Sequence, residues 1–175
     1  MEKNKRPEGF AVVSVGKTGT GKTTEVKKRL RQIYDSDPYR DFLIFDPNHE
    51  FGEFTENKFD DDWKLFAEKI ANVSDAVILV EEATICLDNR KKEGVMVDIL
   101  VKKRHTNTIV FLNFHSWRAI PFYIFDLVNF VTIFKTNDTE RIIRNKCDMP
   151  LVLQAYENVQ KSNDKFKVET VDLYK

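Results

Sequence analysis

The sequence lacks any hydrophobic run long enough to cross a membrane. Apolar stretches such as Ala76–Val80 and Ile120–Phe125 fall far short of the roughly 18 to 20 residues that a spanning helix needs. The first residues are charged and include no apolar segment of signal-peptide length. We therefore expect a soluble protein with no stable membrane insertion that stays in a cytoplasm.

Cysteine, glycine and net charge are also scarce. The 2 cysteines, Cys86 and Cys147, lie in no metal-ligand spacing, which indicates thiols in a reducing compartment. Because 28 Lys and Arg balance 28 Asp and Glu, any contact with nucleic acid needs a local basic patch. Only 6 glycines are present, so their clustering at Gly16, Gly19 and Gly21 needs a physical reason.

The composition that remains is ordinary for a globular protein. Of 175 residues, 42% are hydrophobic and 32% charged, and the chain has no repeat, low-complexity tract or Pro/Gly/Ser-rich linker. These values exclude disordered, collagen-like and coiled-coil classes. We expect a basic N-terminal arm over residues 1–8 and a single domain over residues 9–175.

Short apolar runs alternate with segments of helical periodicity. The runs predict strands at residues 10–15, 42–45, 76–80, 108–114 and 129–134. The periodicity predicts helices at residues 22–34, 61–70, 95–104 and 138–145. The tail over residues 151–174 alternates loosely and predicts one or two edge strands. Because the strands are apolar throughout, we predict an α/β fold with a mostly parallel sheet, covered by helices on both faces. Ligands of such sheets bind beyond the carboxyl ends of the strands.

The glycine cluster belongs to a phosphate-binding motif. Residues 16–23 match G-x-x-x-x-G-K-[ST] at every fixed position, between a predicted strand and a predicted helix. Glycines allow backbone N–H groups to surround an anion, and the helix N-terminus points its positive dipole end at the same place. Lys22 would reach the β- and γ-phosphates, and the Thr23 hydroxyl would bind Mg²⁺. The predicted nucleotide-binding residues are Gly16, Lys17, Thr18, Gly19, Thr20, Gly21, Lys22, Thr23 and Thr24.

Two carboxylates follow the apolar run at residues 76–80. We expect this strand to lie beside the strand at 10–15, so that Glu81 and Glu82 face the phosphate loop. One acid, Glu81, would hold the metal through water, and Glu82 would act as general base toward the water that attacks the γ-phosphorus. The alternative is a solvated acidic turn.

Several segments together resemble the FtsK-HerA superfamily of ring-forming, DNA-pumping ATPases. The segments that carry the resemblance are the phosphate loop, Phe42–Phe51, Glu81–Glu82, Lys103–Asn107, Phe114–Pro121 and Phe134–Asp138. Two residues depart from the family pattern. Glu81 stands where the family has Asp, and His115 stands where it has a Gln sensor, although an imidazole can still donate to a γ-phosphate oxygen or to water.

The resemblance implies a P-loop NTPase fold with ATP and Mg²⁺ as cofactors. Cellular members of the superfamily carry extra domains, so the short chain is most similar to minimal viral or phage genome-packaging ATPases. Such a protein would work as a ring, expected to be a hexamer, that threads DNA independently of sequence. Its partners would include a capsid vertex or portal protein, and its location the host cytoplasm or the virion.

Basic residues outside the loop have two interpretations each. We expect Arg90, Lys91 and Lys92 in a loop between the third strand and the next helix, where the resemblance implies a DNA-binding pore loop. A solvated loop is the alternative. Because Arg104 lies in the turn that resembles the family's, the resemblance implies that it is a candidate arginine finger acting across a subunit boundary. Three further arginines compete for that role, namely Arg118, Arg141 and Arg144.

Two other functions use the same core. A small-molecule or nucleotide kinase would need an acceptor pocket and typically an Arg-rich lid, and no insertion of lid size is evident. A phage assembly ATPase similar to zonula-occludens-toxin proteins would act on a membrane partner, and such proteins usually have a spanning segment.

Overall fold

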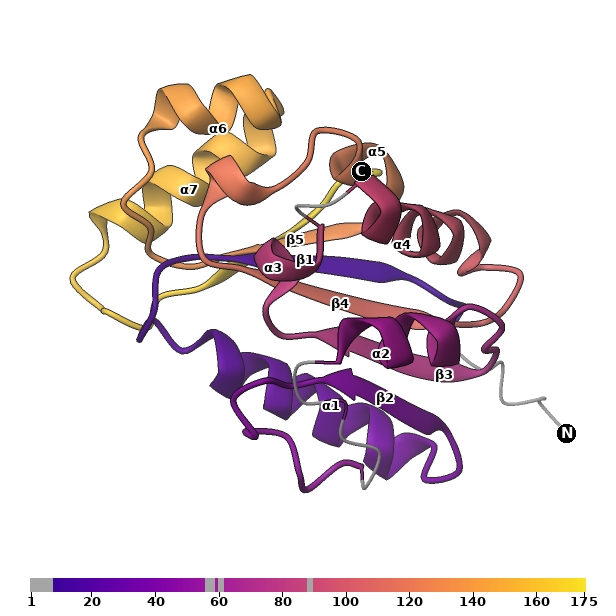
Figure 1. Ribbon diagram of the computed structural model, residues 1–175. Coiled ribbons are helices and arrows are strands. Elements are labelled where there is room, and N and C mark those ends of the chain that lie inside the picture. The colour runs from indigo at the N-terminus through magenta and orange to yellow at the C-terminus, as the bar shows by residue number, and fades with distance from the viewer. Residues whose placement is uncertain (1–7, 56–58, 60–61, 88–89) are drawn as a thin grey trace, which may run out of the picture.

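The computed structural model describes residues 8–55, 59, 62–87 and 90–175 (Figure 1). Within them, one six-stranded sheet has the order β2-β3-β4-β1-β5-β6. The strands are β1 (Ala11–Val15), β2 (Asp41–Phe45), β3 (Ala76–Val80), β4 (Ile109–Phe114), β5 (Phe130–Ile133) and β6 (Glu169–Asp172). All neighbouring pairs are parallel except β5 and β6, which pair antiparallel. The predicted mostly parallel α/β fold is therefore confirmed.

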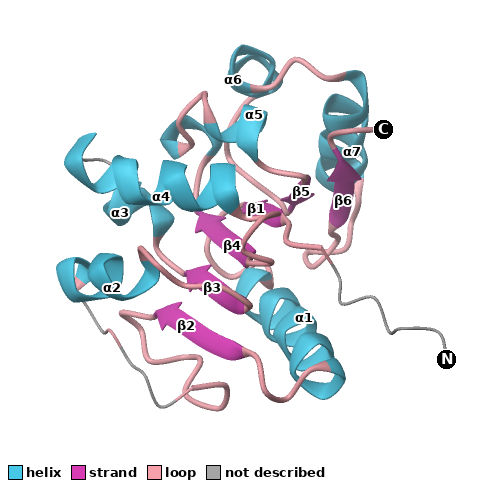
Figure 2. Ribbon diagram, turned by 90° about the vertical axis from the view of Figure 1, so that its right-hand side faces the viewer, coloured by secondary structure: helices cyan, strands magenta, loops and turns pink. Residues whose placement is uncertain are grey.

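Helices cover the two faces of the sheet unequally (Figure 2). The helices are α1 (Lys22–Ser36), α2 (Trp63–Ile70), α3 (Ala83–Leu87), α4 (Arg90–Lys102), α5 (Ile124–Leu127), α6 (Glu140–Lys146) and α7 (Pro150–Lys161), with a 3₁₀ turn, η1, at Trp117–Ala119. In the part of the chain that the structure describes, α1 alone packs on one face, and the other helices share a core on the opposite face. None of the described helices is both long and apolar enough to span a membrane.

Burial explains why these segments form. Every residue of β1, β3 and β4 is buried, as expected for strands with a core on both faces. In α1 the apolar residues Val26 and Leu30 are buried against the sheet, while the half-buried Arg29 pairs with Glu25 at 3.0 Å and donates to Thr132 Oγ1, in β5, at 3.0 Å. Helix α2 begins after Asp62, whose carboxylate accepts the Leu65 N–H at 2.9 Å.

Three expectations from the sequence are wrong, wholly or in part. Strand β3 does not lie beside β1, because β4 is inserted between them. The prediction for the tail is wrong only in part: β6 is an edge strand at Glu169–Asp172, but residues 150–161 form α7, with Pro150 in the first turn and Val152, Ala155 and Val159 buried at helical spacing. Residues 90–92 open α4 instead of lying in a loop, because helix-forming Arg and Lys residues extend the helix toward its N-terminus. The side chains of these residues, and most of the predicted N-terminal arm, lie outside the described part.

The five parallel strands, β1 to β5, have their carboxyl ends at the same edge of the sheet. β1 ends at the phosphate loop, β2 at Asp46, β3 at Glu81 and β4 at His115. Since β4 separates β1 from β3, this edge is two strand spacings wide between the loop and the acidic pair. The ligand site is expected at this edge.

Candidate functional site

The phosphate loop is held to the sheet by backbone contacts on both sides. The Gly16 N–H donates to the Phe114 carbonyl at 3.2 Å, and the Lys17 N–H donates to the Lys135 carbonyl at 2.9 Å. A Cβ on Gly16 would lie 2.5 Å from the Cβ of Phe134, so only glycine fits this approach. Gly21, at the N-terminus of α1, has φ of 91°, which favours glycine. The chain is thereby bent so that the first turn of α1 opens toward the loop.

Lys22 lies inside this loop. Its ammonium group donates to the carbonyls of Gly16 at 2.6 Å and Lys17 at 3.1 Å, and it lies 3.4 Å from His115 Nδ1. Burial lowers the pKa of Lys22, and the charges of Glu81 and Glu82 oppose that effect. The loop carbonyls thus accept hydrogen bonds from the Lys22 ammonium group at the place where the motif predicts phosphate oxygens.

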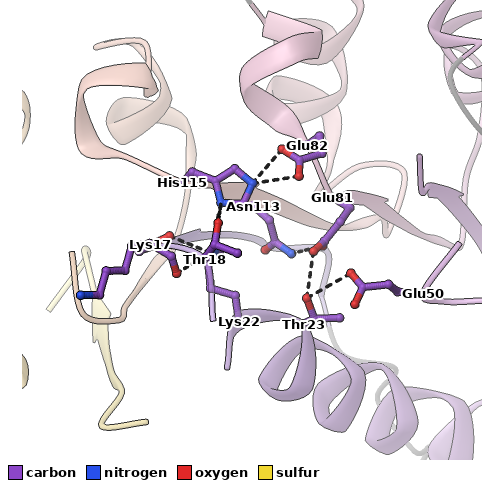
Figure 3. Close-up of polar contacts among 10 residues, drawn as sticks. Lys17, Thr18, Lys22, Thr23, Glu50, Glu81, Glu82, Asn113 and His115 are labelled. Atoms are coloured by element: carbon purple, nitrogen blue, oxygen red, sulfur yellow. Dashed lines mark hydrogen bonds and ion pairs between the residues drawn. The ribbon is translucent and has the colours of Figure 1, made fainter. Parts of the chain in front are cut away.

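Thr23, in the first turn of α1, contacts Glu81, which follows β3, although β4 lies between β3 and β1 (Figure 3). The Thr23 hydroxyl donates to Glu81 Oε1 at 3.1 Å and lies 3.4 Å from Glu50 Oε2. The amide of Asn113, in β4, donates to Glu81 Oε2. Asn113 is itself buried, with its Oδ1 unpaired among the described residues. Three oxygens, from one hydroxyl and two carboxylates, therefore converge beside the loop.

The environment of Glu81 favours its neutral form. Burial raises the pKa of Glu81 from 4.5 to about 7, and the charges of Glu50 and Glu82 act in the same direction. Hydrogen bonds from Asn113 and Thr23 oppose the rise. A cation bound next to Glu81 would therefore stabilise its ionised form.

Glu82 contacts a different partner. His115 Nε2 lies 2.8 Å from Glu82 Oε1 and 2.9 Å from Oε2, while Nδ1 of the same ring faces Thr18 Oγ1 at 3.5 Å and Lys22 Nζ at 3.4 Å (Figure 3). A neutral imidazole with its proton on Nε2 satisfies all of these contacts, donating to Glu82 and accepting from Lys22. His115 therefore connects the phosphate loop to the second acid.

The loop after β2 supplies residues that the sequence analysis did not assign to the site. The Phe51 N–H donates to Asp46 Oδ2 at 2.8 Å, and the His49 N–H donates to the Asp46 carbonyl at 3.2 Å. Phe51 is 1% exposed and anchors this loop in the core. The anchored loop places Glu50 and Asn48 at the site.

A cavity of about 480 Å³ contains most of the predicted site residues. Its lining is Thr18, Gly19, Gly21, Lys22, Thr23, Thr24, Asn48, Glu50, Glu81, Glu82, His115 and Phe166. The structure thus brings the loop, both acids and His115 together. Glu50 and Asn113 were missed by sequence reasoning, although Asn113 could have been noticed as a polar residue inside an apolar strand.

The predicted arginines lie elsewhere. Arg104 is exposed in the turn before β4, at the amino ends of the parallel strands, whereas the phosphate loop lies at their carboxyl ends. Arg118, on η1, contacts Asp138 at 3.5 Å. Arg144 pairs with Glu140 at 2.7 Å and with Asp148 at 3.4 Å, and Arg141 is exposed on the same helix. Among the arginines whose side chains the structure describes, none lines the cavity.

Solved structures with the same fold include viral packaging proteins. The genome packaging NTPase B204 of Sulfolobus turreted icosahedral virus 2, in complex with AMPPCP, has a TM-score of 0.73 at 17% identity, covering 95% of this chain and 93% of that chain. The DNA-packaging ATPase B204 of Sulfolobus turreted icosahedral virus gives 0.70 at 16% identity, covering 94% and 93%. The KaiC-like protein PH0186 of Pyrococcus horikoshii gives 0.54 at 14% identity, covering 76% and 75%. These likenesses confirm the P-loop NTPase fold.

The sequence itself matches a family model. Residues 10–170 match the model described as the central domain of the helicase HerA. No curated protein matches the sequence. The family match covers nearly the whole of the described sheet and every strand that contributes to the cavity.

Proposed function

The chain belongs to the HerA central-domain family, and from that premise we propose that it is an ATP-hydrolysing DNA translocase that packages a viral genome into a preformed capsid. The observation that carries the proposal is the meeting of Thr23 with Glu81, and of His115 with Glu82, at one cavity beside a phosphate loop. The likeness to the B204 packaging proteins over almost the whole length of both chains supports the packaging role. We assign residues 9–175 to a single ATPase domain.

ATP would bind with its phosphates along residues 16–24. Backbone N–H groups of the loop and the dipole of the 15-residue helix α1 would hold the β-phosphate. Lys22 would exchange the carbonyls of Gly16 and Lys17 for phosphate oxygens, which are better partners for a buried cation because they carry full negative charge. Thr24 would contact the α-phosphate.

The oxygens around Thr23 fit Mg²⁺. Among the described residues, no group of three or more His, Cys, Asp or Glu side chains could hold a metal ion alone, as expected for Mg²⁺, which takes few protein ligands and completes its shell with phosphate and water. The Thr23 hydroxyl would bind it directly, with Glu81 and Glu50 holding its water ligands. Bound there, Mg²⁺ supplies positive charge to the β- and γ-phosphates.

Glu82 would be the general base for hydrolysis. Water would attack the γ-phosphorus as its proton passes to a Glu82 oxygen, and the bond to the β–γ bridging oxygen would break, leaving ADP and phosphate. In the structure the Glu82 carboxylate is hydrogen-bonded to His115 Nε2. A γ-phosphate next to Lys22 would compete for His115, which would release Glu82 toward the water.

Assembly and DNA contact complete the proposal. We propose a homo-oligomeric ring, expected to be a hexamer, in which an arginine of one subunit completes the site of its neighbour. Arg104 lies at the opposite edge of the sheet from its own phosphate loop, so it could serve only a neighbour. Arg90, Lys91 and Lys92 would contact DNA phosphates without reading sequence. The motor would act at a capsid vertex or portal, in the host cytoplasm or in the virion.

The proposal is tested by the rate of ATP hydrolysis with and without double-stranded DNA at fixed salt. We expect stimulation by DNA of any sequence, weakening steeply as salt rises. Replacing Arg90, Lys91 and Lys92 by alanine should reduce both the stimulation and its salt dependence. Lys64→Ala is a matched control, because Lys64 is exposed on a different helix and pairs only weakly with Glu68 at 4.0 Å. Turnover indifferent to DNA, together with phosphorylation of a small acceptor, would instead establish the kinase. DNA-indifferent hydrolysis stimulated by membranes would favour the assembly ATPase.

A further inference from the structure

Phe166 is an exposed aromatic side chain at the edge of the phosphate-loop cavity. It lies in the segment between α7 and β6, and its residue is 60% exposed. Its Cδ1 atom lies 3.3 Å from the position that a Cβ on Gly21 would occupy. Phe166 thus presents an apolar ring to water directly beside the polar phosphate loop.

The ring lies where a bound nucleotide would leave the loop. The phosphate-loop cavity includes Phe166 together with Thr24 and both acids, whereas a second cavity of about 370 Å³ includes Phe166 and Thr24 but neither acid. Phe134 and Val168 give this second cavity an apolar lining. A nucleotide with its γ-phosphate at the acids and its α-phosphate at Thr24 would therefore extend its base toward Phe166.

The segment that carries Phe166 is tied to the phosphate loop. The Phe166 N–H donates to Asp164 Oδ1 at 2.8 Å, and the Asp164 N–H donates to Ser162 Oγ at 3.1 Å. The Lys135 ammonium donates to the Ser162 carbonyl, while the Lys135 carbonyl accepts the Lys17 N–H at 2.9 Å. One residue at the exit of β5 thus fixes both segments, which reduces the entropy lost when a ligand orders the ring.

We propose that Phe166 forms the nucleobase platform of this site, with its ring stacked on the purine base of bound ATP. The inference rests on the proposed ATP-binding function and adds the base contact that the phosphate-loop motif does not supply. Lys165 supports the arrangement, since its Nζ lies 5.5 Å from the Phe166 ring centroid and 3.9 Å from the Cβ position of Gly19, adding positive charge beside the phosphates.

Affinity for ligands with and without a base tests the platform. Calorimetric titration with Mg²⁺–ATP and with Mg²⁺–tripolyphosphate separates the base contact from the phosphate contacts. Phe166→Ala should weaken ATP binding by about fivefold to a hundredfold, the range for loss of one base–aromatic stack, and leave tripolyphosphate binding unchanged. Phe166→Tyr should restore ATP binding. Tyr174→Ala is the matched control, because Tyr174 is 61% exposed in the same C-terminal segment but follows β6, at the opposite edge of the sheet.

A spectroscopic measurement gives an independent test. In Phe166→Trp, ATP should quench the fluorescence of the new indole, and tripolyphosphate should not. Trp63 and Trp117 are buried, so their fluorescence should respond equally to the two ligands. Equal loss of both ligands in Phe166→Ala, or unchanged ATP affinity, would overturn the platform while leaving the ATPase proposal intact. Failure of the wild-type protein to bind either ligand would overturn the ATPase proposal and the platform with it.

Discussion

The substitution Glu81→Gln should stabilise the metal-free protein at alkaline pH. Glu81 is 6% exposed, and its pKa is raised from 4.5 to about 7, chiefly by burial. Between these two values the folded chain retains a proton that the unfolded chain has released, so stability falls as the pH rises through this window. The loss is complete above about pH 8. A difference of about 2.5 between the two pKa values corresponds to roughly 3 kcal/mol in the free energy of unfolding.

Glutamine preserves the local contacts without the titration. Its amide oxygen can accept from Asn113, and its amide N–H can donate to Thr23 Oγ1. Relative to wild type, we expect Glu81→Gln to gain stability with rising pH, reaching about 3 kcal/mol at pH 8 compared with pH 4.5. The same variant should bind Mg²⁺–ATP more weakly, since a neutral amide holds the metal's water ligands less well than a carboxylate. The wild-type glutamate would then bind Mg²⁺–ATP more tightly than glutamine does, while making the metal-free protein less stable at alkaline pH.

Urea unfolding in EDTA, without nucleotide, measures the effect directly. Wild type, Glu81→Gln and the control Glu68→Gln are compared at pH 5 and pH 8. Glu68 is on the exposed surface of α2, so its substitution should stay within about 0.5 kcal/mol at both pH values. A stability difference between Glu81→Gln and wild type that is equal at both pH values, or a variant less stable at pH 8, would refute the reasoning.

Four further predictions follow from the site. Glu82→Gln should keep ATP affinity and lower kcat by about 10²- to 10⁴-fold, and unchanged single-turnover hydrolysis would remove Glu82 as the base. Lys22→Ala should weaken ATP binding by about tenfold to a hundredfold in calorimetry, because it removes a charge-assisted hydrogen bond; equal affinity would contradict the phosphate assignment. His115→Gln should retain more hydrolysis than His115→Ala in steady-state assays, because an amide can still donate to Glu82 or phosphate; the reverse order would exclude the sensor role. Gly16→Ala should lower the free energy of unfolding by about 1 to 3 kcal/mol in urea, since the new Cβ meets Phe134, and a neutral result would show that the loop yields.

Much of the fold followed from local sequence pattern. The strand at Ala76–Val80 and the start of α1 at Lys22 agree with prediction, because apolar runs and the glycine loop impose strong local constraints. The strand order could not be predicted from local pattern, because the insertion of β4 between β1 and β3 depends on long-range packing that adjacent residues do not encode. In the tail the edge strand β6 agrees with prediction. The first part of the tail was misread because Leu151, Leu153 and Ala155 alternate, which concealed the helical period of the buried residues in α7.

The site was predictable where a motif fixes it and not where the fold assembles it. Residues 16–23 and the acidic pair were found because glycines and adjacent carboxylates are rare enough to stand out. Glu50 joins the site from 27 residues beyond Thr23, and only the anchored loop after β2 brings it there. Phe166 carried no signal at all, because an aromatic residue in a polar tail shows its neighbours only once the chain is folded.

The most direct test of the account is a structure of the protein bound to Mg²⁺ and a non-hydrolysable ATP analogue. We expect the triphosphate between residues 16 and 24, Lys22 turned from the loop carbonyls to the β- and γ-phosphates, and Glu82 released from His115 toward a water in line with the γ-phosphorus. A nucleotide bound elsewhere, or Glu81 and Glu82 both turned away from the terminal phosphate, would contradict the central claim.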